Sequence, residues 1–128
     1  MRALLPSMKS ILALALAAVA CLTCGCGSEK APPEISTSQI AAGAPDVFKG
    51  ASAETQKLAA EAVEAIGKQD FTTAWEKLQT LNATPNLTEP QKEFVAASIA
   101  SVGAEVNKAE ESGNEVAQEA LKFHRANK

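Results

Sequence analysis

The sequence has few of the residues that usually stabilise a small domain. Its only cysteines are Cys21, Cys24 and Cys26, so the rest of the chain cannot form disulfides. Tyrosine is absent, and the aromatic residues are one tryptophan and four phenylalanines. Alanine is abundant, and Ala-rich helices bury little area per residue, so we expect modest stability. Helix packing or a partner must therefore stabilise whatever folds after Cys26.

Positive charge is also scarce. Without residues 1–25 the chain keeps 10 lysines and arginines against 15 acidic residues, which gives a net charge of about −5. This balance argues against binding to nucleic acid and against electrostatic attachment to an anionic membrane surface. The two signs alternate along the chain, as on a solvated surface, and the length allows one domain at most.

Residues that could carry out catalysis are nearly absent. The single histidine, His124, falls in the last turn of a predicted helix, where a cation suits the helix C-terminus. No cysteine, serine or acidic pair is placed beside it by spacing. The acidic residues Glu110, Glu111 and Glu115 lack the oxygen-rich loop and glycine turn of a cation site. We therefore expect no enzyme activity, no cofactor and no metal site.

The first residues have the three parts of a secretory signal. Arg2 and Lys9 precede an uncharged run from Ile11 to Leu22, and small residues follow. As a helix, a run of about 12 residues spans roughly 18 Å, which is short of the ~30 Å hydrocarbon core of a bilayer. This favours a signal peptide over residues 1–25 rather than a permanent transmembrane helix.

The end of this signal resembles the lipobox of bacterial lipoproteins. In that family a cysteine after a small residue receives lipid and becomes the new N-terminus. Cys26 follows Gly25 and precedes Gly27 and a polar linker, so it is the preferred lipidation site; Cys21, which follows Ala20, is the alternative. The resemblance implies a protein anchored by lipid to a membrane of the bacterial cell envelope, facing the periplasm or the exterior.

The remaining residues divide into a tether and a helical domain. Residues 26–44 are polar and interrupted by Pro32 and Pro33, which predicts a lipidated N-terminus and a disordered tether. Residues 45–128 predict the helical domain. Its first helix begins between Pro45 and Ser52 and ends near residue 68. The second runs from residue 71 to about residue 82, with Asp70 as its N-cap.

The third helix has the clearest start, a capping box from Thr88 to Gln91. Apolar and small residues then recur at alternating spacings of four and three, which is a heptad pattern. The pattern favours one long helix, although Gly113 could end it and begin a fourth, short helix. We therefore predict an all-α fold: a helical hairpin plus a long third helix in a small bundle. The repeating positions are Val95, Ile99, Val102, Val106, Ala109, Gly113, Val116, Ala120 and Phe123.

Two further resemblances concern parts of the chain. Gly67, Asp70, Phe71 and Ala74 resemble the middle of a tetratricopeptide repeat, in which a small residue lets two helices touch. The match covers a single unit, whereas such solenoids need several. The terminal Lys128 resembles that of murein lipoproteins, heptad helices whose last lysine can be joined to the cell wall.

These features predict a membrane-anchored envelope lipoprotein that acts as a non-catalytic protein–protein interaction module. The alternative is a structural spacer or a lipoprotein linked to the cell wall through Lys128. Contact with a protein partner, or self-association, is expected along the heptad pattern. The residues expected to make this contact are Val95, Ile99, Val102, Val106, Val116 and Phe123.

Overall fold

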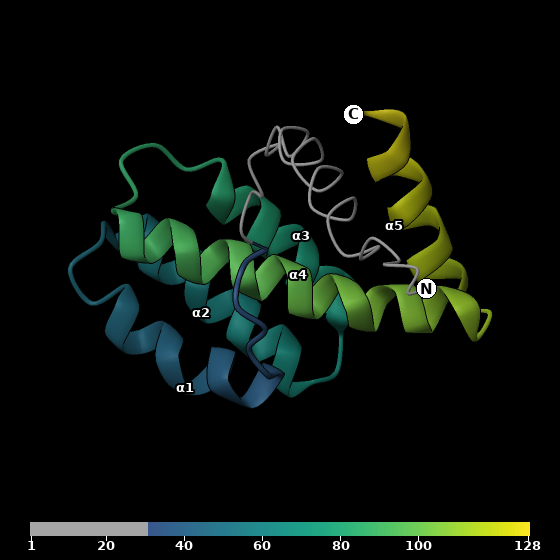
Figure 1. The fold of residues 1–128 in the computed structure, drawn as a ribbon, viewed down its shortest axis with the longest axis horizontal. Helices are drawn as coiled ribbons and strands as arrows, with labels where there is room; N and C mark the ends of the chain where they lie inside the picture. The colour runs from purple at the N-terminus through teal and green to yellow at the C-terminus, as the bar shows by residue number, and fades with distance from the viewer. Residues whose placement is uncertain (1–30) are drawn as a thin grey trace, which may run out of the picture. The chain divides into compact units, whose positions relative to one another are not determined.

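Residues 31–128 are described by a computed structural model, and this part of the chain is helical without any strand (Figure 1). The predicted all-α class is therefore confirmed. Cys21, Cys26 and the predicted signal peptide lie outside the described residues. The helices are α1 (Thr37–Val47), α2 (Ala53–Gly67), α3 (Phe71–Asn82), α4 (Glu89–Glu111) and α5 (Glu115–Ala126).

Helix α1 occupies part of the segment for which the sequence predicts a disordered tether. Ser36 begins it with a capping box, in which the Ser36 hydroxyl accepts from the Gln39 amide and the Gln39 side chain accepts from the Ser36 amide. Ile40 and Ala44 are buried on its inner face. The boundary predicted at residue 45 is thus wrong, and Pro45 lies inside α1 rather than at the start of a helix. A separate helix, α2, begins after its N-cap Ser52.

Helices α2 and α3 form the predicted hairpin. The Asp70 side chain accepts a hydrogen bond from the Thr73 amide, so Asp70 is the N-cap of α3 as expected. Gln69 adopts a left-handed conformation with φ of 58° in the turn. Ala74 is fully buried, which lets the two helices approach closely. On the exposed side of the turn, Glu64 raises the pKa of Lys68 by accepting its hydrogen bond at 2.6 Å.

Helix α3 of the hairpin packs against α4, and α1 contacts both α2 and α4 (Figure 1). Thr88 and Gln91 form the capping box that the sequence predicted at the start of α4. The Gln91 side chain also donates to the carbonyl oxygen of Val47, which ties the start of α4 to the end of α1. The largest fully buried side chains are Ile40, Leu78, Leu81, Val95, Val102 and Val106, together with Ser98.

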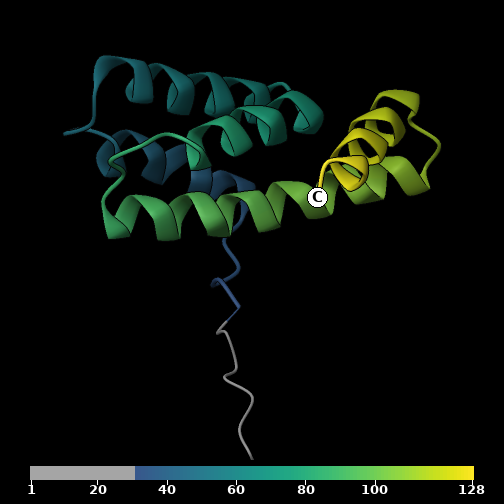
Figure 2. The same ribbon diagram turned by 90° about the horizontal axis from the view of Figure 1, so that it is seen from above.

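Helix α4 does not continue through Gly113. The prediction of a single long helix is therefore wrong, and the alternative of a further short helix after Gly113 is correct. Gly113 has φ of +88°, a left-handed conformation that suits glycine at a helix end. Asn114 then caps α5 by accepting a hydrogen bond from the Ala117 amide. Helix α4 has 23 residues and spans about 34 Å, against about 18 Å for the 12 residues of α3. Figure 2 shows α5 turned back beside the overhanging end of α4.

Candidate functional site

The predicted contact residues separate into two groups. Val95, Val102 and Val106 are fully buried in the core of the chain, and Ile99 is packed against that core. The α4 part of the heptad pattern is therefore occupied by the chain's own helices. Val116 and Phe123 remain 66% and 72% exposed and are the exposed large hydrophobic residues of the described part.

The turn at Gly113 explains this separation. Because the chain reverses there, the residues of the heptad pattern do not form one continuous helix face from α4 into α5. Helix α5 buries Ala117 and Leu121 instead, each one position after a residue of the predicted pattern. Arg125 holds α5 against α4 through two hydrogen bonds to the Glu110 carboxylate, at 3.1 and 3.0 Å. Val116 and Phe123 are left exposed on α5.

Val116 and Phe123 line a groove between α3 and α5 with a volume of about 560 Å³. On each helix the lining side chains lie on one face and extend over two turns, and their spacing along the sequence is the same in both helices. Each wall spans nine residues, or eight steps along its helix, and is about 12 Å long. The α3 wall is Thr72, Trp75, Glu76, Gln79 and Thr80, and the α5 wall is Val116, Glu119, Ala120, Phe123 and His124.

The two walls meet where His124 packs against Trp75. The ring centroids are 4.7 Å apart and the planes are inclined by 67°, which is an edge-to-face contact. Trp75 is only 8% exposed and belongs to the core of the described residues. Gly103 on α4 makes room for it, because a Cβ there would lie 3.2 Å from the indole Nε1. Trp75 therefore forms a fixed part of the groove.

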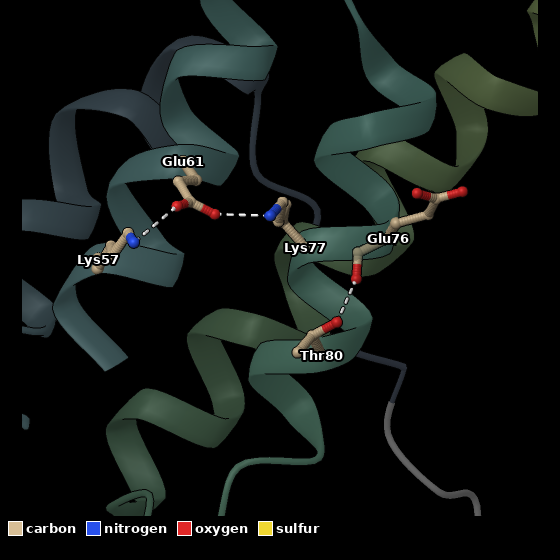
Figure 3. A network of polar contacts seen from close by, with 5 residues as sticks. All are labelled: Lys57, Glu61, Glu76, Lys77 and Thr80. Atoms are coloured by element: carbon tan, nitrogen blue, oxygen red, sulfur yellow. Dashed lines mark hydrogen bonds and ion pairs between the residues drawn. The ribbon is translucent and has the colours of Figure 1, made fainter. Parts of the chain in front are cut away.

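Acidic side chains give the groove its charge. Glu76 and Glu119 are both exposed, and no lysine or arginine is among the described residues that line it. Figure 3 shows the Glu76 carboxylate directed away from the neighbouring ion pairs of α2 and α3. Lys77 is thus paired with Glu61 on the opposite side of α3, and its positive charge does not neutralise the acids of the groove.

That opposite side holds the α2–α3 hairpin together. The Lys77 ammonium lies 2.6 Å from the Glu61 carboxylate, and Lys57 lies 3.9 Å from its other oxygen. The hydrogen bond from Lys77 is the main reason that the pKa of the Glu61 carboxyl falls below its ordinary value. Desolvation of Glu61 opposes this shift.

Hollows also lie elsewhere on the surface of the described residues. A hollow of about 410 Å³ lies between α1 and α2 around Phe48 and Val63, and one of about 590 Å³ lies near Thr84 and Thr88. Across residues 31–128 there is no group of three or more histidine, cysteine or acidic residues that could hold a metal ion. None of the helices in this range is long and apolar enough to cross a membrane.

Comparison with known proteins finds no family model, no curated protein and no solved structure that matches this chain. The helical hairpin at Asp70 and Ala74 is present, while its resemblance to a tetratricopeptide repeat remains a resemblance of local sequence. The acidic wall residues Glu76 and Glu119 were not singled out from the sequence. Glu76 and Glu119 lie on opposite walls of the groove because the chain reverses at Gly113, and the heptad pattern did not indicate this reversal.

Proposed function

We propose that this chain is a lipid-anchored lipoprotein of the bacterial cell envelope whose helical domain binds a protein partner in the α3–α5 groove. The anchor is supported by Arg2 and Lys9, the uncharged run after them, and the small-residue junction at Cys26. In this proposal the domain is a non-catalytic interaction module. Its partner contacts differ from the predicted set, because only Val116 and Phe123 of that set are exposed.

The exposure of Phe123 is the observation on which the binding role depends. A phenylalanine side chain that is 72% exposed forgoes most of the roughly 1.5–3 kcal/mol that its burial would contribute. Phe123 lines the same groove as Val116, about two helical turns further along α5, and these two residues and the buried Trp75 contribute its apolar surface. Large aromatic side chains in such hollows often dominate the energetics of protein–protein interfaces.

The binding role is tested by crosslinking in intact cells. A photo-crosslinking phenylalanine analogue is placed at Phe123, and in a separate strain at Ala42, which is exposed on α1. We expect position 123 to give a protein–protein product that position 42 does not give. The additional substitution Val116→Ser should reduce the yield several-fold, whereas Gln118→Ser, at an exposed position on the same helix, should leave it unchanged. Identical products at positions 123 and 42, or none at 123, would contradict the proposal.

The anchor is tested separately by the intact mass of the protein extracted from membranes with detergent. We expect a chain that begins at Cys26 and carries acyl chains on that residue. A chain that begins at Cys21 would move the lipidation site to the alternative cysteine. A chain that begins at Met1, or one without acyl groups, would remove the anchor from the proposal.

A further inference from the structure

The groove has features that specify the chemistry of its occupant, provided that the proposed binding role holds. Its ten lining residues include two exposed carboxylates and no lysine or arginine. Val116, Ala120 and Phe123 contribute the apolar surface of the α5 wall and Trp75 that of the α3 wall, and each wall carries one of the two acids. An occupant must therefore present apolar side chains to the groove and positive charge beside them.

The walls also restrict the backbone of the occupant. Both walls are helical, and the described residues form no strand whose edge could pair with an extended peptide. A helix satisfies its own backbone hydrogen bonds and needs none from the walls. The walls are about 12 Å long, which matches two turns of a helix with apolar residues at positions i, i+3 or i+4, and i+7. A helix therefore fits this groove better than a strand.

The same charges disfavour the other occupants. A second copy of this chain docked groove to groove would place Glu76 and Glu119 of each copy near the acids of the other. An anionic membrane surface would be repelled in the same way. We therefore infer that the α3–α5 groove binds an amphipathic helix of another protein, with an apolar stripe flanked by lysine or arginine residues that face Glu76 and Glu119.

The inference is tested with designed peptide probes and the full, detergent-solubilised protein. The first probe is a fluorescent, alanine-based helix of about 18 residues with leucines at i, i+4 and i+7, flanked by lysines. The second has glutamate in place of every lysine. The third keeps the composition of the first, but its leucines are scattered around the helix. Binding is measured by fluorescence anisotropy.

We expect saturable binding of the lysine probe, with at least about tenfold weaker binding of both other probes. Raising the salt concentration from about 50 mM to about 500 mM should weaken the lysine probe several-fold, because exposed charges are screened. The double substitution Glu76→Gln and Glu119→Gln should reduce the preference for lysine over glutamate several-fold. Glu93→Gln, at an exposed acidic residue of α4, should leave that preference unchanged.

Four outcomes would overturn the inference: equal affinity for the lysine and glutamate probes, binding of the scattered probe as tight as that of the first, crosslinking from position 123 to lipid, or crosslinking to a second copy of the chain. If position 123 gives a specific product with another protein but the probes show no charge preference, the binding role stands and the basic helix is wrong. If position 123 gives no product, the binding role itself fails.

Discussion

The turn between α2 and α3 and the turn between α4 and α5 have the same backbone geometry but join very different hairpins. In each turn one residue after the helix has a positive φ: Gln69 in the first turn and Gly113 in the second. The backbone amide of the following residue then donates to a carbonyl oxygen in the last turn of the helix, from Asp70 to Ala65 and from Asn114 to Ala109. The side chains of Asp70 and Asn114 then cap the next helix.

The two hairpins differ in how much of their second helix is buried. Helix α3 buries Ala74, Trp75, Leu78 and Leu81, and it contacts α2, α4 and α5. Helix α5 has the same length but buries only Ala117 and Leu121. The α2–α3 hairpin therefore stabilises the domain, while α5 is held by few contacts and leaves its remaining apolar residues on the surface. A helix end of this kind therefore does not by itself reveal whether the next helix packs into the core.

Truncating a leucine on each helix should separate the two roles most strongly. Leu81→Ala should lower the free energy of unfolding by about 2–5 kcal/mol, since Leu81 is fully buried between packed helices. Leu121→Ala should cost about 2 kcal/mol or less and should act mainly on α5, because that end can relax. Urea denaturation gives the totals, and hydrogen exchange locates the change. A larger loss for Leu121→Ala would reverse the assignment of roles.

Exchanging the residues at the two left-handed positions should have opposite effects. Gly113→Gln forces a side chain into a conformation with φ of +88° and should cost about 1–2 kcal/mol. Gln69→Gly relieves the same strain at φ of 58° and should stabilise the protein by about 1 kcal/mol or less. Gly50→Gln is the control, because a Cβ at Gly50 meets nothing within 4 Å. Stability that is unchanged by either turn substitution would contradict the equivalence of the two turns.

The ion pair of the α2–α3 hairpin should make its stability depend on acid pH. Because the folded state lowers the pKa of Glu61, its stabilising contribution is present above the ordinary carboxyl pKa of 4.5 and is lost as the pH falls through the lowered value. Glu61→Gln should therefore be less stable than the parent at neutral pH, and the difference should vanish in acid. Denaturation midpoints measured from neutral pH to about pH 2 test this, with Glu93→Gln as the matched control. A constant difference across the range would rule out the linkage.

The smallest change in stability is expected at the most exposed aromatic residue. Phe123→Ser should change the free energy of unfolding by less than about 0.5 kcal/mol, since 72% of the side chain is already in water. Thermal or urea denaturation of this variant also serves as the folding control for the binding experiments. A loss above about 1 kcal/mol would mean that Phe123 belongs to the core.

Local signals in the sequence predicted much of the bundle. The Asp70 cap and Thr88 capping box were identified because each acts on its own first turn. The equivalent box at Ser36 and Gln39 has the same pattern, but it lies in a segment rich in polar residues and proline, and α1 was missed. In that helix Ile40 and Ala44 become core residues only through contact with distant parts of the chain.

Local sequence patterns could not predict the groove, for a related reason. The heptad pattern continued in register past Gly113, so a continuous helix and a reversed one looked alike in the sequence. The reversal is decided by the fit of Ala117 and Leu121 against the bundle and by the Arg125–Glu110 pair, which are contacts between separate helices. Once α5 turns back, residues Thr72 to Thr80 and Val116 to His124 face one another.

The early start of α1 limits how far the domain can reach. If lipid is attached at Cys26, only ten peptide units separate the anchor from Ser36, where the helical body begins. Even a fully extended chain of that length covers at most about 35 Å. With that anchor, a protein that binds the proposed groove must come close to the same bilayer, so membrane-bound proteins and those that collect at the membrane surface are the first candidates to test.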